Sequence, residues 1–475
     1  MRGWLAAILT SLSPLSPRRS TFAYAALLVC LSAYLLDARV GASAHSFLMM
    51  DDQIRDWRLA LGPFSALPLV GTSSTAGGAS LGPIYYWVLW LSRVVLGPLL
   101  HNQPHAGAYG IALCQGAADL LLFEALRRRF ASIPLAMAIV LATATAPHDL
   151  AVSSTIWNPA VSVAFVKVAL ALRLLQGDRR SLWWSAGVMA ASWTAVQAHS
   201  SAIFVAAPLA LVDVWQALRH DAIVAALERV RVLVEVVVLL QVPWLIHMLR
   251  QTSDTAPTRA LAGASDAITG GHLRLTESFH AAFDGLTSIL TAPWQGQASG
   301  AVLMTCLAVA LVRWRRDLPL VAMTVAPPVL AVVGFSLWQG DYNEYWYLPL
   351  APCVAFGVIL GATTWRPTVA VPLALTVVLA AQPGHMAVAH TYYRMPVYGP
   401  LSVGSVRLAK QAHVLRRVYT EFNLPMFSDE TFPYQAAGGH IAQDAAFDGW
   451  IDRNGATRFT PVKRDASGPT PPASQ

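Results

Sequence analysis

The sequence predicts an all-α polytopic membrane protein with about eleven transmembrane helices. Of the 475 residues, 55% are hydrophobic and only 12% are charged, whereas a soluble globular domain carries about 25% charged residues. Apolar runs long enough to cross a bilayer follow one another along most of the chain. Arginine clusters separate these runs, so the net charge of +7 is a signal of membrane topology and does not indicate nucleic-acid binding.

Eleven apolar runs are expected to span the membrane. They are Thr21–Ala38, Ala106–Leu126, Ser132–Pro147, Pro159–Leu175, Leu182–Ala198, Ser201–Leu218, Val232–Leu249, Gly300–Val312, Leu318–Trp338, Tyr345–Thr363 and Pro367–Ala381. A further apolar run, Leu81–Leu100, is interrupted by Pro83 and Pro98. The stretch between the two prolines has about 14 residues and would form a helix of about 21 Å, which is too short to cross the hydrocarbon core. We therefore predict an interfacial helix at 84–97.

The arginine clusters set the expected orientation. They are Arg127–Arg129, Arg179 with Arg180, Arg219 with Arg229 and Arg231, Arg313 with Arg315 and Arg316, and Arg366. If Leu81–Leu100 does not cross, every cluster falls in the cytoplasm, as the positive-inside rule requires. The N-terminus is then cytoplasmic and the C-terminus extracytoplasmic, in the inner (plasma) membrane of a bacterium.

Two regions follow from this topology. Residues 1–381 form a multi-pass membrane domain, in which residues 40–104 are the first outer loop. Residues 382–475 form an extracytoplasmic C-terminal region. In it Ser402–Phe422 is a helix candidate, and the chain is expected to be disordered from about residue 466 because of its Pro and Ser content. Glu277–Leu290 places apolar residues at helical spacing and predicts another surface helix.

The first outer loop concentrates the chemistry. Residues 49–58 read MMDDQIRDWR, so that Asp51 and Asp52 lie beside Arg55 and Arg58. Residues 71–87 read GTSSTAGGASLGPIYYW, a Gly/Ser/Thr loop that leads into the aromatic interfacial helix. Such a loop lets backbone N–H groups approach an anion, and arginine forks can neutralise a phosphate. A carboxylate beside the membrane can act as a general base on a hydroxyl. The alternative is a solvated polar loop without function.

This combination resembles the GT-C superfamily of membrane glycosyltransferases, above all its protein O-mannosyltransferase-like and aminoarabinose-transferase-like branches. The resemblance rests on the acidic pair after the first helix and on the outer "GP-x-YYW" motif, and it covers roughly residues 18–381. It implies a GT-C-like helical bundle and transfer of a sugar, with inversion, from a polyprenyl-phosphate donor. It also implies that Asp51 is the catalytic base, with Asp52 as the second candidate. Arg55, Arg58, Ser80, Tyr85 and His199 are the candidates for binding the donor phosphate or substrate.

The chain departs from that family in two places. Aminoarabinose-type members carry a lysine directly before the proline of the outer motif, where this chain has Gly82. They also carry an arginine three residues after the first acid, where this chain has Ile54. Either Arg55 or Arg58 replaces these donor contacts, or the donor contacts of this chain differ from those of the family.

Other polar residues are expected on the outer face. Asp149 in the second outer loop, and Asp341 with Glu344 in a later one, are candidates for binding the acceptor or a metal. These carboxylates could bind Mg²⁺ or Mn²⁺, but their spacing does not require a metal. Aromatic residues around Glu344 also suit an interfacial belt, and His199 could simply satisfy a helix end.

A few charges fall inside expected spans. Asp119 and Lys167 lie at similar depth above the cytoplasmic side, and isolated charges there are costly. We predict a structural ion pair between their helices. In a transporter the same pair would belong to a proton relay.

The predicted function is therefore a membrane glycosyltransferase that uses a polyprenyl-phosphate-linked sugar and a glycan, lipid or protein acceptor, in contact with membrane lipids. The alternatives are a transporter or flippase of lipid-linked sugars, which would need functional charges near the midplane, and a non-catalytic protein of the same fold.

Overall fold

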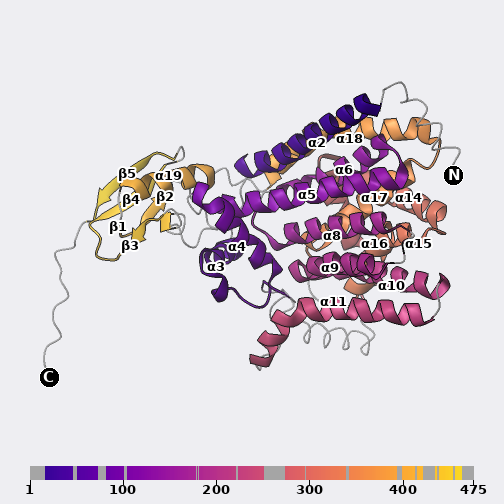
Figure 1. Cartoon of the computed structure of the whole chain (residues 1–475). Coiled ribbons are helices and arrows are strands. Elements are labelled where there is room, and N and C mark those ends of the chain that lie inside the picture. The colour runs from indigo at the N-terminus through magenta and orange to yellow at the C-terminus, as the bar shows by residue number, and fades with distance from the viewer. Residues whose placement is uncertain are drawn as a thin grey trace.

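A computed structural model describes residues 17–462 except 46–50, 73–81, 101–103, 154, 178, 180, 221–222, 251–272, 295, 339–341, 393–397, 412–413, 421–433, 436–437 and 453–454. The chain is a multi-pass membrane protein built from a long helical bundle, with a small sheet beyond one end (Figure 1). In the described part, eight helices are long and apolar enough to span a membrane. They are α2 (Pro17–His45), α5 (His105–Phe130), α8 (Asn158–Gln176), η3 with α10 (Ser200–Ala202, Ile203–His220), α11 (Ile223–Arg250), α14 (Gln297–Trp314), η5 with α17 (Glu344–Leu350, Ala351–Ala362) and α18 (Pro367–Tyr392).

A ninth candidate span is broken. Helices α15 (Leu318–Thr324) and α16 (Ala326–Phe335) meet at an angle of 51° where we expected one continuous span. Pro327 and Pro328 open α16. Because proline lacks an N–H and clashes with the preceding turn, it disrupts the helix at this point.

The two remaining expected spans are shorter helices. Ser132–Pro147 contains α6 (Ile133–Ala144), which has 12 residues, and Leu182–Ala198 is α9 (Leu182–Ala198), which has 17. Ser132 accepts a hydrogen bond from the Leu135 N–H and so caps α6. The described residues thus supply eight or nine candidate spans where the sequence suggested about eleven.

The first outer loop contains the expected helix and a second one. These are α3 (Asp51–Leu61), followed by η1 (Phe64–Ala66), and α4 (Ile84–Leu96), followed by η2 (Gly97–Leu99). Helices α3 and α4 lie at the end of the bundle that faces the C-terminal sheet (Figure 1). The predicted helix at 277–290 is α13 (Leu275–Thr291), which continues into η4 (Ala292–Trp294).

The C-terminal region contains strands, so the expectation of an all-α chain was wrong there. Helix α19 (Tyr398–Gln411) ends before β1 (Val414–Leu415) and β2 (Val418–Thr420), which occupy the second half of the helix expected at 402–422. Strand β2 pairs in parallel with β4 (Phe447–Ile451), which pairs antiparallel with β5 (Thr457–Pro461), and β1 pairs with β3 (His440–Ile441). Leu415 and Val418 are buried in this sheet region rather than along a helix. The β-branched Val418 and Thr420 favour a strand once a partner strand is available.

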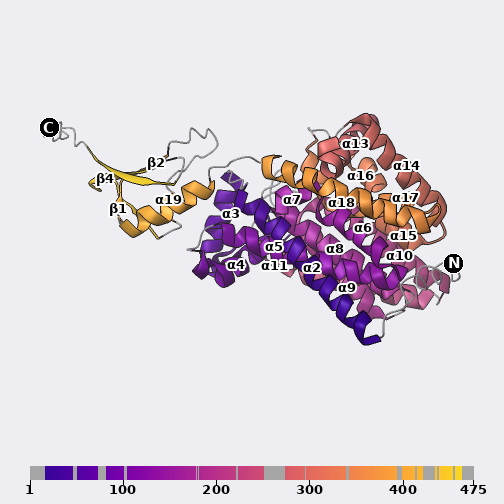
Figure 2. The same ribbon diagram turned by 90° about the horizontal axis from the view of Figure 1, so that it is seen from above.

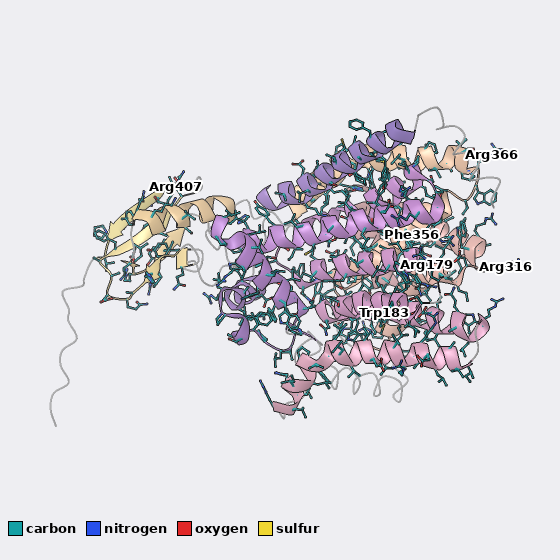
Figure 3. All side chains as sticks on the ribbon, in the orientation of Figure 1. Arg179, Trp183, Arg316, Phe356, Arg366 and Arg407 are labelled. Carbon is teal, nitrogen blue, oxygen red and sulfur yellow. The ribbon has the colours of Figure 1, made fainter. Side chains whose placement is uncertain are left out.

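The bundle has two chemically different ends. One end carries the arginine clusters, and we call it the arginine-rich end. Figure 3 shows Arg316 and Arg366 there, and Arg407 lies in the C-terminal region beyond the opposite end. The view from above in Figure 2 likewise places α3, α4 and the sheet away from the N-terminus. Helix α18 continues through Pro383 to Tyr392, past the expected domain boundary at residue 381.

A buried ion cluster joins four segments of the bundle. The predicted pair is confirmed, because Lys167 Nζ lies 2.9 Å from Asp119 Oδ1. Arg39 Nη2 of α2 lies 2.7 Å from Asp119 Oδ2 and 3.2 Å from Asp149 Oδ2, and Lys167 Nζ is also 2.9 Å from Asp149 Oδ2. Asp149 belongs to α7 (Pro147–Ser153). Gln115 accepts a further hydrogen bond from Lys167. Two cations and two carboxylates therefore compensate each other away from water.

We expect Lys167→Met to destabilise the protein by about 3–5 kcal/mol, because it leaves two buried carboxylates with one cation. Arg231→Gln is the control, because the Arg231 pairs with Glu228 and Glu235 are exposed to solvent and contribute little to stability. Equilibrium unfolding in mixed micelles measures both. Equal, small losses in the two variants would contradict a structural role for the cluster.

Candidate functional site

A polar cavity of about 490 Å³ lies between α13, the start of α14 and η5. Its lining residues are Ala281, Phe283, Asp284, Gly285, Thr287, Ser288, Gly296, Gln297, Tyr342, Asn343, Glu344 and Tyr347. Carboxylate, amide and phenol side chains thus line one cavity. Of the residues expected to bind an acceptor or metal, Glu344 is the one that the structure places in this cavity.

Glu344 connects three segments at the cavity. The Ser288 hydroxyl of α13 donates to Glu344 Oε2 at 3.3 Å, and His148 Nδ1 of α7 lies 4.0 Å from Glu344 Oε1. The Glu344 side chain is 40% exposed, whereas that of His148 is buried. Burial lowers the pKa of His148 to about 4, although the Glu344 carboxylate acts in the opposite direction. At neutral pH a neutral imidazole therefore lies beside a half-exposed carboxylate.

Tyr347 forms the inner wall of the cavity. A side chain at Gly285 would meet the Tyr347 ring at 2.7 Å, so the glycine lets α13 approach η5 closely. The Tyr347 hydroxyl is buried and has no hydrogen-bond partner among the described residues. A buried hydroxyl without a partner is costly, and a polar group of a ligand in the cavity could supply one.

Aromatic contacts bring other predicted residues to the same end of the bundle. The Tyr345 ring, next to Glu344, lies 5.0 Å from Trp157 and 6.1 Å from His199 between ring centroids. Tyr85 of α4 donates to the Ile156 carbonyl at 2.8 Å, directly before Trp157. Tyr85 and His199 therefore both approach the segment that carries Glu344, from loops far apart in sequence.

His199 is a neutral group in this setting. Its Nδ1 lies 2.7 Å from the Ser201 hydroxyl, and burial lowers its pKa to about 4. Burial also raises the pKa of Tyr85 well above its usual value, with a smaller effect from Asp56. Near neutral pH neither side chain therefore supplies a charge, and each already makes a hydrogen bond within the protein.

The two arginines of the first loop differ in their surroundings. Arg55 Nε donates to Asp56 Oδ1 at 2.9 Å, and its Nη2 lies 2.8 Å from the same oxygen. Asp56 is buried and also accepts from the Tyr86 hydroxyl at 3.2 Å. Arg58 is exposed near the end of α3. Asp56 thus holds the Arg55 guanidinium against α4.

Packing accounts for Gly82, one of the two departures from the family motif. A side chain at this position would meet the Gln197 side chain at 2.4 Å. Gln197 in turn donates to the Leu240 carbonyl. A lysine at position 82 would therefore require the Gln197 side chain to move.

Asp149 lies in a different environment from the one expected. Both of its close cationic partners, Arg39 and Lys167, belong to the buried ion cluster, and only 2% of Asp149 is exposed. Its neighbour His148 is the residue of α7 that meets Glu344. The segment that contains Asp149 therefore approaches Glu344 through His148.

Several candidates fall outside the described residues. The backbone of Asp51 and Asp52 begins α3, but their side chains are not described, and Ser80 and Asp341 lie in undescribed segments. Among the described residues, no group of three or more His, Cys, Asp or Glu side chains could hold a metal ion.

Sequence reasoning missed Asp284, Ser288 and the role of His148. The first two lie on the polar face of α13, opposite the apolar spacing that predicted this helix. That polar face was the available signal. The partnership of His148 with Glu344 had none, because it depends on how α7 packs.

An apolar groove of about 350 Å³ adjoins the polar cavity. It runs between α13, α14 and α16, and its lining is almost entirely aliphatic and aromatic. Phe283 and Thr287 line both the groove and the cavity. Exposed Met304, Leu311 and Val329 show that the groove opens on the outer surface of the bundle. The polar cavity and the apolar groove thus share one wall.

We expect stability to fall as the pH drops from about 6.5 towards about 4. Folded His148 and His199 stay neutral down to about pH 4, whereas an unfolded histidine takes up a proton near pH 6.5. The unfolded chain then binds more protons, so stability rises with pH across this window. The thermal midpoint in detergent should depend less on pH in His148→Gln/His199→Gln. Exposed His280→Gln is the control and should behave as wild type; an unchanged slope in the double variant would refute the assignment.

No protein-family model matches the sequence, and no curated protein matches it. Several solved structures align with the fold, among them the following three. ArnT from Cupriavidus metallidurans in the apo state aligns with a TM-score of 0.52 at 14% identity, over 89% of this chain and 86% of that chain. An oligosaccharyltransferase from Archaeoglobus fulgidus, in complex with zinc and sulfate, aligns at 0.47 and 13%, over 87% and 61% of the two chains. ArnT bound to undecaprenyl phosphate aligns at 0.44 and 14%, over 89% and 86%. The chain thus has a fold similar to that of ArnT, and the predicted resemblance to GT-C membrane glycosyltransferases is confirmed at the level of the fold.

Proposed function

We propose that this protein is a glycosyltransferase that moves a sugar from a polyprenyl-phosphate carrier to an acceptor outside the cytoplasm, with inversion. The observation that carries the proposal is the shared wall of the polar cavity and the apolar groove at Phe283 and Thr287. A polyprenyl-phosphate sugar is itself a polar head on a long apolar chain. The groove would take prenyl units from the lipid, and the cavity would take the sugar.

The proposed topology has eleven crossings. Helix α9, with 17 residues, is about 25 Å long and lies at the lower limit for a span, whereas α6, with 12, would need its flanking turns to cross. The arginine-rich end then faces the cytoplasm, in accordance with the positive-inside rule. The cavity, α3 and α4 face outward, in the inner membrane of a bacterium.

The proposed reaction is a single displacement at the anomeric carbon. Asp51 takes the proton from an acceptor hydroxyl while its oxygen bonds to the anomeric carbon. The bond from that carbon to the phosphate oxygen breaks, and the polyprenyl phosphate leaves with the electron pair. Attack from the face opposite the leaving group inverts the centre. Asp52 is the second candidate for the base.

The developing phosphate charge needs preorganised donors. Arg55, Arg58 and Ser80 are the proposed donors from the first loop. Tyr85 and His199 are further candidates, and the Tyr85 hydroxyl would have to leave the Ile156 carbonyl to donate to the phosphate. Asp56 holds Arg55 in one orientation, which reduces the entropy lost when it binds phosphate. Arg55 and Arg58 would replace the lysine that the family carries where this chain has Gly82.

Glu344 is the proposed anchor for hydroxyl groups in the cavity, together with Asp284 and Asn343. A carboxylate accepts hydrogen bonds from sugar hydroxyls, and the nearby Tyr342 and Tyr345 offer aromatic faces. Asp341 and Asp149 remain candidates for acceptor or metal binding. Mg²⁺ or Mn²⁺ at the outer carboxylates would be an addition to this scheme and is not needed for the displacement.

We expect Asp51→Asn to lower glycosyl transfer about 10²–10⁴-fold, because it removes a general base. Asp52→Asn should retain most of the activity. The assay measures transfer from radiolabelled polyprenyl-phosphate sugars to endogenous acceptors in membranes, with matched expression of the three proteins.

Equal transfer by all three proteins would rule out the Asp51 mechanism. The absence of transfer with every donor tested would favour a transporter, a flippase or a non-catalytic membrane protein.

We expect Glu344→Gln to raise KM about 10-fold or more, because a hydrogen bond to a charged group contributes about 1.5–3 kcal/mol. The kcat should change far less than in Asp51→Asn, since Glu344 holds substrate and does not move the proton. Exposed Glu228→Gln on α11 is the control. A KM equal to that of wild type would remove Glu344 from the proposed site.

A further inference from the structure

A second polar cavity, of about 380 Å³, lies at the arginine-rich end. The ends of α5, α8 and α14 and the start of α15 enclose it. Arg129, Arg173, Arg313 and Arg316 line it, with Asp317 as the one carboxylate in its lining. Four guanidinium groups against one carboxylate give the cavity a strongly positive potential, which attracts anions.

Two of the four arginines are held in place by the protein. Arg129 Nη2 lies 2.8 Å from Asp317 Oδ2, and Asp317 also accepts from the Leu320 N–H and so caps α15. Arg173 donates to Gln176 at 2.6 Å and to Gln216 at 2.5 Å. These contacts fix the two guanidinium groups before any ligand arrives, which lowers the entropic cost of binding.

The other two arginines have no carboxylate partner in the described part of the chain. Arg313 and Arg316 are both exposed. The Arg313 guanidinium lies 6.0 Å from the centroid of the Trp314 ring. Asp317 already pairs with Arg129. The cavity therefore presents two uncompensated cations at its mouth.

Trp314 supplies an independent observation. Its indole Nε1 is buried and has no hydrogen-bond partner among the described residues. An indole N–H is a donor only, and tryptophan is enriched where a membrane meets water. An oxygen atom of a ligand in this cavity could accept that hydrogen bond.

Part of the remaining wall is apolar. Leu320 and Met323 line the cavity with Trp314, and the cavity lies at an end of a membrane-spanning bundle, where lipid headgroups are found. A fully hydrated anion gains nothing from an apolar wall, whereas the glycerol and first methylenes of a lipid do.

We propose that this cavity binds the phosphate group of an anionic phospholipid. Arg313 and Arg316 contact the phosphate oxygens, the Trp314 N–H donates to one of them, and Arg129 and Arg173 supply the fixed positive field. Basic pockets between transmembrane helices suit such headgroups. The inference is independent of glycosyl transfer, because it needs only the cavity and its place at the membrane surface.

The experiment uses the full chain, purified in a non-ionic detergent. Phosphatidylglycerol, phosphatidylcholine and inorganic phosphate are titrated separately, and the thermal unfolding midpoint is followed, with native mass spectrometry counting retained lipid. We expect phosphatidylglycerol to raise the midpoint and stay bound, and the other two to do neither. Arg313→Gln/Arg316→Gln should weaken the response about 10-fold or more, since it removes both uncompensated cations near the phosphate.

Arg315→Gln is the matched control, because Arg315 is an exposed neighbour that does not line the cavity. It should respond as wild type. Trp314→Phe should weaken binding while keeping all four arginines.

An equal loss in Arg315→Gln and the double variant would indicate diffuse charge attraction and overturn the site. Equal responses to phosphatidylglycerol and phosphatidylcholine, or an unaltered response in the double variant, would do the same. A shift produced by inorganic phosphate alone and lost in the double variant would keep the phosphate site and overturn the lipid as its source.

Discussion

The ion cluster of Arg39, Asp119, Asp149 and Lys167 is the constraint on which the rest of the bundle depends. Each charge alone would be costly inside an apolar protein, and together they are compensated. The four residues come from α2, α5, α7 and α8, so compensation requires these segments to meet at one place. Because Asp149 holds α7 in place, His148, the residue before Asp149, lies beside Glu344.

The 3₁₀ segment η5 brings together aromatic residues from several segments, as the ion cluster brings together charged ones. Its Tyr345 contacts Trp157 and His199, and its Tyr347 fills the space that Gly285 leaves open. The helix α13 and the loops before α8 and α10 therefore converge on a single short segment. The cavity exists because a glycine permits this close approach.

The two polar cavities lie at opposite ends of the bundle and differ in the sign of the charge that their lining side chains carry. The one lined by η5 presents Asp284 and Glu344 with hydroxyls and an apolar groove, which suits neutral polyols on a lipid. The one at the arginine-rich end presents guanidinium groups and an indole N–H, which suit a phosphate. The same asymmetry of arginine that orients a chain in a membrane also builds a binding surface at that end.

The sequence by itself determined the membrane class, most spans, the outer helix at 84–97 and the ion pair of Asp119 with Lys167, because transfer from water to lipid acts on local runs of residues. It did not determine the break before α16 or the strands after α19. At both places more than one backbone conformation is compatible with the local sequence, and tertiary packing selects one of them. Only the tertiary structure placed Asp149 in the ion cluster, paired His148 with Glu344 and joined a cavity to a groove. Those partners are distant in sequence, and no local pattern records which surfaces of two helices will meet.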